Sequence, residues 1–275
     1  MYGLNSVFVA GNCAKDPVYF GEAERRVAKI TLMIDRPKAK DAEKSTADAI
    51  TCTLFGKNAD YLEKCEVKKG SNVAIQGRYT TGSYEKDGKK VYTREVAANA
   101  FDGVEVIREG NLKENFVILR GRLTADPDKR VVGENETEMS TYTIAVDRPF
   151  KAKDEEKITD FIKVVVYGNP AHFANEHFKK GDYVTVKGRL RSGSYTQKTT
   201  GETIYTLDVQ ADENRFNQKK GAGKSEESAE TPTEPTDVDE TAETAPETEE
   251  PKDESSDDPD FLLSELDDDD ELPFN

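Results

Sequence analysis

Two segments of the chain repeat one another, and this duplication limits what the chain can fold into. The segment KGSNVAIQGRYTTGSY at 69–84 matches KGDYVTVKGRLRSGSY at 180–195. Other matched blocks are separated by offsets of 110 to 112 residues, so the duplication contains only small insertions and deletions. Because each unit has the length of one small domain, the sequence predicts two similar domains, 1–109 and 111–217.

Within each unit, apolar and polar residues alternate with a period of two, which indicates half-buried β-strands. The expected strands lie at 5–13, 27–35, 48–56, 72–84 and 91–100 in the first unit and at 115–124, 140–148, 159–167, 183–195 and 203–211 in the second. The helical candidates, Asn58–Lys64 and Pro170–Phe178, lie between the third and fourth strands of their units. We expect Asn169 to cap the second helix, because Pro170 suits the first helical position.

Five strands with one helix between the third and fourth is the order of the OB-fold, a small and partly open barrel. A five-stranded barrel of the SH3 type is the alternative, but the helix and the long fourth strand favour the OB-fold. The glycines inside strand patterns, at Gly11, Gly77, Gly121 and Gly188, predict bulges or sharp bends of the barrel.

The last fifth of the chain has a different composition. Residues 221–275 contain 22 acidic and two basic residues, and therefore account for the net charge of −16, while the two units are close to neutral. Residues 221–259 have almost no large apolar side chain and cannot bury enough surface to offset the entropy of ordering. We therefore predict an all-β chain of two tandem OB-fold barrels, followed by a disordered acidic tail over 218–275.

Several classes of protein are excluded by what the sequence lacks. It has no apolar run of about 18 residues and no signal peptide, so we expect a cytoplasmic protein. The cysteines, Cys13, Cys52 and Cys65, lack metal-ligand spacing and fit a reducing compartment. Neither His172 nor His177 has a Cys or His partner at zinc spacing. Since no Ser/His/Asp or Cys/His arrangement supports nucleophilic catalysis, we expect no enzymatic activity, no metal and no cofactor.

The repeated blocks and the end of the chain resemble the bacterial single-stranded DNA-binding protein family. The resemblance rests on VAGNCAKDP at 9–17, LFGKNA at 54–59, KGSNVAIQGR at 69–78, GSYEKDGKKVYTREV at 82–96, their counterparts in the second unit, and DDDDELPF at 267–274. Most members of the family have one OB unit and form tetramers. A chain with two units is similar to the tandem type, which reaches four barrels as a homodimer.

The resemblance implies sequence-independent binding of single-stranded DNA in replication, recombination and repair, in the cytoplasm and at the nucleoid. Such binding needs aromatic side chains on which bases stack and cations along the phosphate backbone. The resemblance places stacking residues at Phe55, Tyr84, Phe150, Phe161, Tyr167 and Tyr195. The first unit has Lys38 and Ala49 where the second has Phe150 and Phe161, so we expect the second unit to bind more tightly. The alternative is that some of these aromatics belong to the barrel core.

The cations expected to contact phosphate, and to make binding salt-sensitive, are Arg36, Lys38, Arg78, Arg148, Lys151, Arg189 and Arg191. Arg36 and Arg148 each follow an aspartate, Asp35 and Asp147. An ion pair with that aspartate is the alternative role for each of these two arginines.

A short apolar segment follows acidic residues at the end of the sequence. Such a segment is suited to bind a protein that has a hydrophobic pocket with a basic rim. The residues expected to bind partners are Asp269, Asp270, Leu272, Pro273 and Phe274. In the family this tip binds replication and repair proteins, although here Asn275 follows the phenylalanine. A tandem OB protein that binds RNA or an oligosaccharide is the rival interpretation; it explains the barrels but not the Pro-Phe ending. An adaptor whose barrels bind proteins would not need six aromatics at groove positions.

Overall fold

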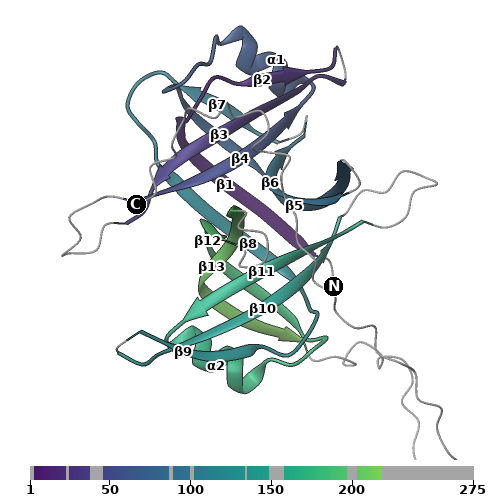
Figure 1. Cartoon of the computed structure of the whole chain (residues 1–275), viewed down its shortest axis with the longest axis vertical. Helices are drawn as coiled ribbons and strands as arrows, with labels where there is room; N and C mark the ends of the chain where they lie inside the picture. Colours follow the sequence, from purple (N-terminus) through teal and green to yellow (C-terminus); the bar gives the residue numbers. More distant parts are fainter. Residues whose placement is uncertain are drawn as a thin grey trace, which may run out of the picture.

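The computed structural model describes residues 3–22, 25–37, 46–86, 89–99, 102–133, 135–148, 158–196 and 203–218, and its two units are stacked along the long axis of the molecule (Figure 1). The first unit contains β1 (Leu4–Cys13), β2 (Val18–Phe20), β3 (Val27–Asp35), β4 (Ala47–Phe55), α1 (Lys57–Lys64), β5 (Asn72–Lys86), β6 (Lys89–Ala98) and β7 (Val104–Ile107). The second contains β8 (Glu114–Leu123), β9 (Asp128–Val132), β10 (Thr137–Asp147), β11 (Thr159–Tyr167), α2 (Asn169–His177), β12 (Tyr183–Thr196) and β13 (Thr203–Gln218). The two helices lie at opposite ends of the molecule.

In each unit, the first long strand closes the barrel by pairing with two others. β1 pairs antiparallel with β3 and β5, and β4 pairs parallel with β6. In the second unit, β8 pairs in the same way with β10 and β12, and β11 pairs parallel with β13. Five long strands with one helix between the third and fourth confirm the predicted OB-fold in both units.

The ten predicted strands are present, and the largest difference in their ends is at β13, which continues to Gln218. The polar residues at the end of β13 pair with the start of β12, around a register irregularity at Lys187 and Gly188. The short strands β2, β7 and β9 were not predicted. Four of the five residues of β9 are exposed, so this strand has no alternation of buried and exposed residues to reveal it.

Each barrel is filled by alternate residues of its strands, and a helix closes one end of it. α1 buries Ala59 and Leu62. In the second unit, Phe178 follows α2 and is fully buried, with its ring in an edge-to-face contact with Tyr142 at 5.7 Å between centroids. Burial of a side chain of this size contributes about 1.5–3 kcal/mol.

A glycine in the left-handed conformation precedes each helix. Gly56 has a φ of 54° and Gly168 a φ of 65°, and no side chain caps either helix. The prediction that Asn169 caps α2 is therefore wrong, because Asn169 is already helical. A residue with a Cβ is strained at such φ values. The glycine is thus what turns the chain into the helix directly after the last residue of β4 or β11.

The four glycines inside strands lie where two backbones come close together. A Cβ on Gly11 would be 2.5 Å from the carbonyl oxygen of Met33, and a Cβ on the equivalent Gly121 would be 2.3 Å from that of Ala145. Gly77 and Gly188 are as close to the last strand of their barrel, as expected for glycines at bends. Any larger residue at these positions would push the barrel strands apart.

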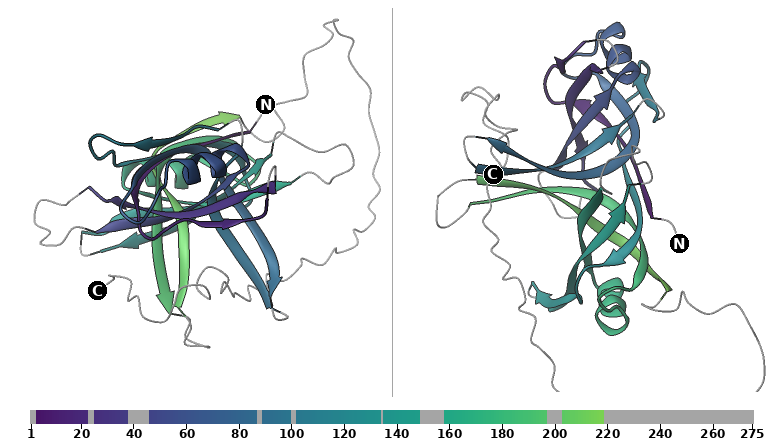
Figure 2. Two further views of the ribbon diagram at one scale, coloured as in Figure 1. Left: turned by 90° about the horizontal axis from the view of Figure 1, so that it is seen from above. Right: turned by 90° about the vertical axis from the view of Figure 1, so that its right-hand side faces the viewer.

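The two units share one continuous sheet, which was not predicted from the sequence. β1 pairs antiparallel with β8, with Val7 opposite Val117, and β5 and β12 flank this central pair. Val7 and Val117 are themselves repeat equivalents, so an approximate two-fold axis passes between them. The long hairpins β5–β6 and β12–β13 project to the same side of the molecule (Figure 2).

A buried aspartate of the second unit binds the β5 hairpin of the first. Asp160 is 1% exposed and accepts hydrogen bonds from Nε and Nη2 of Arg148 at 2.9 and 2.7 Å. The same carboxylate accepts the backbone N–H of Thr81 at 2.9 Å, and Arg148 donates to the carbonyl oxygen of Thr81 at 3.1 Å. The hydrogen bond with Asp160 raises the pKa of Arg148. One ion pair thus fixes the position of one unit against the other.

The equivalent aspartate of the first unit makes the reciprocal contact. Asp48 is 2% exposed and accepts hydrogen bonds from Nε and Nη2 of Arg36 at 2.9 and 2.7 Å. It also accepts the backbone N–H of Ser192, in β12 of the second unit, at 2.9 Å. We call Asp48 and Asp160 the interunit aspartates. Each is held between an arginine of its own unit and the hairpin of the other.

The residue that contacts the helix from the strand side is a cation in the first unit and a carboxylate in the second. In the first, Arg26 pairs with Glu63 of α1 at 2.5 Å. At the repeat-equivalent position of the second, Glu138 pairs with Lys129 at 2.7 Å and contacts Asn175 and His172 of α2 at 2.9 and 3.0 Å. The hydrogen bonds from Lys129, Asn175 and His172 lower the pKa of Glu138 to about 2.

We expect this carboxylate to make the stability of the protein depend on pH in the acid range. Because the folded-state pKa of Glu138 is depressed, its contribution is present above the unfolded pKa of about 4.5 and is lost as the pH falls towards 2. Thermal unfolding at several pH values should show Glu138→Gln to be less stable than the parent at pH 7, with a difference that closes towards pH 2. A constant difference across this range would contradict the assignment.

Candidate nucleic-acid interface

The outer face of β11 carries a row of large side chains that alternate with core residues. Phe161 is 58% exposed and Tyr167 is 42% exposed, with Lys163 and Val165 between them on the same face. The residues at alternate positions point into the barrel, among them Ile162 and Val164. Phe161 and Tyr167 therefore lie outside the core, as the stacking prediction requires.

The same face of β4 in the first unit carries smaller side chains. Phe55 ends the strand at 37% exposure, as Tyr167 ends β11. Ala49 stands at the position of Phe161, and Thr51 at the position of Lys163. Phe55 is likewise outside the core, but the rest of this face offers no second ring and no cation. The expected asymmetry between the units is therefore present in the composition of these two strands.

Cations of β12 lie two strands from the β11 row, with β13 between them. In the β12–β13 ladder, Arg189 is opposite Gln210 and Arg191 is opposite Asp208, while β13 pairs with β11 at Val165. Arg191 is exposed and, within the described ranges, makes no hydrogen bond or ion pair. Arg189 is half-buried, with Nη2 at 3.4 Å from the carboxylate of Asp212. Arg191 is thus the cation of this strand that is most available to a phosphate.

The first unit has one predicted cation on the corresponding strand. Arg78 of β5 is half-buried and lies opposite Ala97, as Arg189 lies opposite Gln210. The position that corresponds to Arg191 is occupied by Thr80.

Arg36 and Arg148 make a contact in the structure that was not predicted from the sequence. Both guanidinium groups are bound by the interunit aspartates, and neither pairs with the preceding aspartate. A guanidinium held by a buried carboxylate has fewer donors to offer a phosphate. We therefore assign Arg36 and Arg148 to the contact between the units, while their expected contact with phosphate stays a prediction.

The hairpins carry exposed aromatics that the sequence analysis missed. Tyr84 and Tyr195 lie in β5 and β12 as expected, opposite Val91 and Ile204, although their side chains are outside what the structure describes. Tyr92 is 40% exposed and Tyr205 is 37% exposed. The sequence repeat already pairs these two tyrosines, because VYT at 91–93 recurs as IYT at 204–206.

Some predicted site residues lie outside the described ranges. They are Lys38, Phe150, Lys151 and the tail residues Asp269, Asp270, Leu272, Pro273 and Phe274. Their assignments remain predictions.

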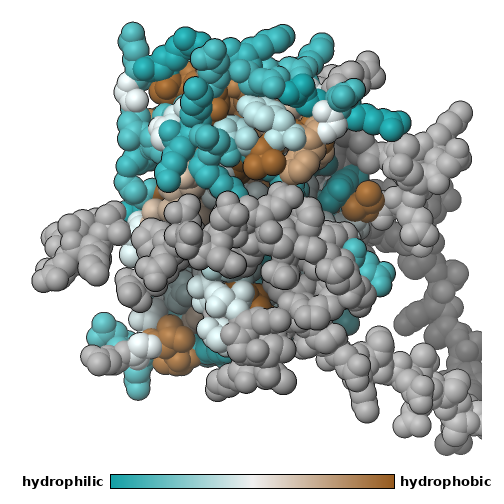
Figure 3. Space-filling view, turned by 45° about the horizontal axis from the view of Figure 1, so that its top comes forward, coloured by the Kyte–Doolittle hydropathy of each residue, from teal (hydrophilic) through white to brown (hydrophobic). Residues whose placement is uncertain are grey.

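The first unit shows no broad apolar area on the side seen in Figure 3. Hydrophilic side chains cover most of the described surface there, and apolar residues form small spots among them. Such scattered residues are normal on a protein surface. In the part of the chain that is described, neither helix has the length and apolar character needed to cross a membrane.

Comparison with known proteins assigns both units to one family. The model of the "Single-strand binding protein family" matches residues 4–104 and 114–217. A single-stranded DNA-binding protein of Fusobacterium nucleatum is 36% identical over 117 residues, which span 42% of this chain and 74% of that protein. The protein of the same name from Thermotoga maritima is 39% identical over 123 residues, 43% of this chain and 86% of the relative.

A solved structure has the same fold over most of the chain. The wild-type single-stranded DNA binding protein of Thermus aquaticus superposes with a TM-score of 0.64 at 24% identity, covering 82% of this chain and 98% of that one. The superposition therefore includes both barrels. With two matches to the family model over most of its length, this chain belongs to the single-strand binding protein family.

Proposed function

We propose that this protein binds single-stranded DNA without reading its sequence, and that the β11 face is the main contact. The observation that carries the proposal is the row of Phe161, Lys163 and Tyr167, with Arg191 two strands away. Bases of a single strand expose their ring faces and stack on exposed aromatics, while cations pair with the phosphates. Phe55 extends the surface onto the first unit. Arg78 and Arg189 are the further cations of this proposal.

Stacking on rings needs no hydrogen-bond readout of base edges, so the mode of binding is tolerant of sequence. Nothing in this mode requires a reaction, and we propose a binding protein rather than an enzyme. The family and the free thiols of Cys13, Cys52 and Cys65 support a cytoplasmic, nucleoid-associated location.

Competition between nucleic acids tests the proposed function and its rival, an RNA- or oligosaccharide-binding OB protein. The full chain is titrated with a labelled oligothymidylate, in competition with unlabelled single-stranded RNA, duplex DNA and a neutral oligosaccharide, at fixed salt. We expect unlabelled oligothymidylate to displace the label at the lowest concentration. Stronger competition by RNA or by the oligosaccharide would favour the rival.

We also propose that the chain forms a homodimer with four barrels, through the outer face of the β1–β8 pair. Phe116 is 45% exposed on this face, opposite Phe8, and Ile118 is half-buried beside them. A second copy related by a two-fold axis would cover these apolar side chains with the same set of its own.

Light scattering should therefore report twice the chain mass of 30.6 kDa. Phe116→Glu should shift the mass towards a single chain, because it places a charge in the centre of the apolar contact. Val131→Glu is the matched control, since Val131 is an exposed apolar residue on β9 and should leave the mass unchanged. A parent protein that is monomeric at micromolar concentration, or a Phe116→Glu variant that remains a dimer, would contradict the proposed interface.

For the tail, we propose recruitment of replication and repair proteins by the tip residues Asp269, Asp270, Leu272, Pro273 and Phe274. We also propose that the acidic charge of the tail competes with phosphate for the DNA surface. Removal of residues 221–275 should raise affinity for oligothymidylate a few-fold at low salt and less at high salt, because salt screens the competition. Phe274→Ala keeps the charge and should leave DNA affinity unchanged. Equal affinity with and without the tail at low salt would contradict the competition.

A further inference from the structure

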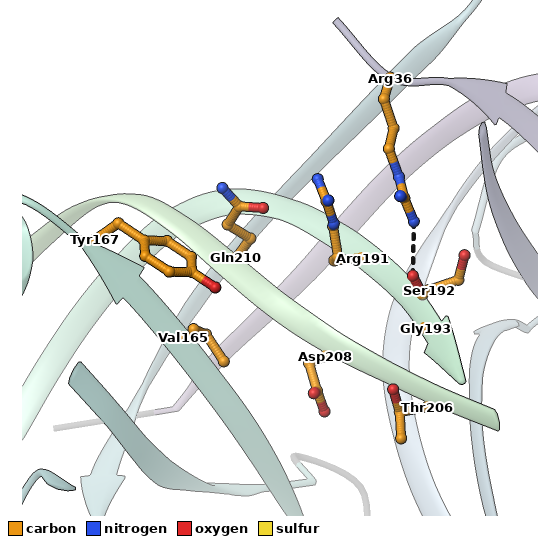
Figure 4. A pocket seen from close by; sticks show the side chains of 9 residues that line it. All are labelled: Arg36, Val165, Tyr167, Arg191, Ser192, Gly193, Thr206, Asp208 and Gln210. Atoms are coloured by element: carbon orange, nitrogen blue, oxygen red, sulfur yellow. Dashed lines mark hydrogen bonds between the residues drawn. The ribbon is translucent and has the colours of Figure 1, made fainter. Parts of the chain in front are cut away.

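A hollow of about 590 Å³ lies at the edge of the proposed DNA surface, where the second unit meets the first (Figure 4). Its walls come from β11, β12 and β13, and Arg36 of the first unit closes one side. The ring of Tyr167 lies at one end beside Gln210, Arg191 lies between Gln210 and Arg36, and Asp208 lies below them. The size lies in the range of pockets that hold small molecules.

Two polar side chains of this hollow have no hydrogen-bond partner among the described residues. Within the described part of the chain, the side-chain amide of Gln210 and the guanidinium of Arg191 make no hydrogen bond. The carboxylate of Asp208 forms an ion pair with Lys163 at 3.7 Å, a separation at which its oxygens can still accept a hydrogen bond. An acceptor, an amide and a cation therefore line the same hollow as the exposed ring of Tyr167, and each can still bind a ligand.

Resting on the proposed function, we propose that the hollow holds one nucleotide of the bound strand and prefers a base that carries an exocyclic amino group. The base stacks on Tyr167, the carboxylate of Asp208 accepts from the amino group, and the amide of Gln210 contacts the same edge. Arg191 pairs with the adjacent phosphate. Cytosine presents an amino donor where thymine presents the O4 acceptor, so thymine would place one acceptor against another. Most of the bound DNA strand is held without base preference, and this subsite adds a preference at one nucleotide.

The first unit does not have this subsite. In the β5–β6 ladder, Glu95 stands at the position of Asp208, but its carboxylate accepts the hydroxyl of Thr53 at 2.8 Å and lies 4.0 Å from Lys29. Ala97 and Thr80 replace Gln210 and Arg191. The first unit thus has an ion-paired carboxylate in the same place that also accepts a side-chain hydrogen bond, which provides a control within the same chain.

The test compares the affinities of the full chain for oligodeoxycytidylate and oligothymidylate of equal length, at the same salt and neutral pH. The measured quantity is the ratio of the two Kd values. Asp208→Asn replaces a pure acceptor by a group that also donates to thymine O4, so it should shift this ratio towards thymine by about fivefold or more. Gln210→Ala gives the second unit the residue that the first already has, and it should weaken the binding of both oligonucleotides, because an amide both donates and accepts.

Glu95→Gln is the matched control and should leave the ratio within about twofold of the parent, since its shift would fall below the value of one good base contact. The proposal is overturned if Asp208→Asn leaves the ratio unchanged while the protein still binds both oligonucleotides. It is also overturned if Glu95→Gln shifts the ratio as much as Asp208→Asn does. A parent protein that binds neither oligonucleotide would overturn the proposed function itself, which is a separate result.

Discussion

Replacing Asp160 with alanine is expected to lower the stability of the protein by about 3 kcal/mol, the typical cost of removing one partner of a buried ion pair. The change leaves the guanidinium of Arg148 and the N–H of Thr81 without their acceptor. For a folded region of this size, the midpoint of thermal unfolding should fall by roughly 6–12 °C. Calorimetry of the full chain measures the shift.

Asp128→Ala is the matched control for this substitution. Asp128 also pairs with an arginine, Arg130, at 2.7 Å, but both side chains are more than half exposed. An exposed pair contributes about 0–1 kcal/mol, so the control should melt close to the parent. If Asp160→Ala and Asp128→Ala have the same midpoint of thermal unfolding, the interunit aspartates do not hold the two units together.

Loss of the two rings on the β11 face should weaken single-stranded DNA binding more than any other change in the described residues. Stacking of one base on an aromatic side chain contributes about 1–3 kcal/mol. Phe161→Ala together with Tyr167→Ala should therefore raise the Kd for oligothymidylate by about 30-fold or more. The single change Phe55→Ala in the first unit should have a smaller effect, because no second ring stands beside it on β4.

Phe20→Ala provides the control for a lost exposed ring away from the proposed surface. Phe20 is 40% exposed on β2, close to Phe55 in exposure, so its removal deletes a similar surface ring. We expect its Kd to match that of the parent. A similar loss of affinity in Phe20→Ala and in the Phe161 and Tyr167 double variant would mean that the β11 face is not the binding surface.

Much of the fold follows from local sequence patterns. The period of two gave the long strands, and the repeat placed corresponding strands in both units. Gly11 and Gly121 marked close contacts between strands because a glycine in a strand needs a structural reason. The short edge strand β9 was not predicted, because its residues are exposed on both faces and buried and exposed positions do not alternate.

The contact between the units could not be predicted in the same way. Ser192 and Asp48 are 144 residues apart in sequence, and their pairing depends on β1 lying beside β8. From the sequence, Arg148 had an adjacent aspartate, Asp147, as its obvious partner. The partner is Asp160, across a strand pair, because the register of β10 with β11 places it inside the contact. Sequence distance therefore pointed to the wrong carboxylate.

The exposure of a strand residue could be predicted from the sequence where the alternation along the strand is regular. Phe161 and Tyr167 share one parity on β11, and the structure places both on the outer face. The base-binding hollow had no signal in a single strand, because Tyr167, Asp208 and Arg191 come from three strands and gain their meaning from the register between them.

The central claim is that the outer face of β11 contacts single-stranded DNA, and ultraviolet crosslinking tests it most directly. The full chain is irradiated in complex with oligothymidylate, and the crosslinked peptides are identified by mass spectrometry. Other exposed aromatics serve as internal controls: Phe20 on β2, Tyr61 on α1 and Phe173 on α2. The account predicts crosslinks at Phe161 and Tyr167, with a weaker one at Phe55. Crosslinks confined to Phe20, Tyr61 or Phe173 would contradict it.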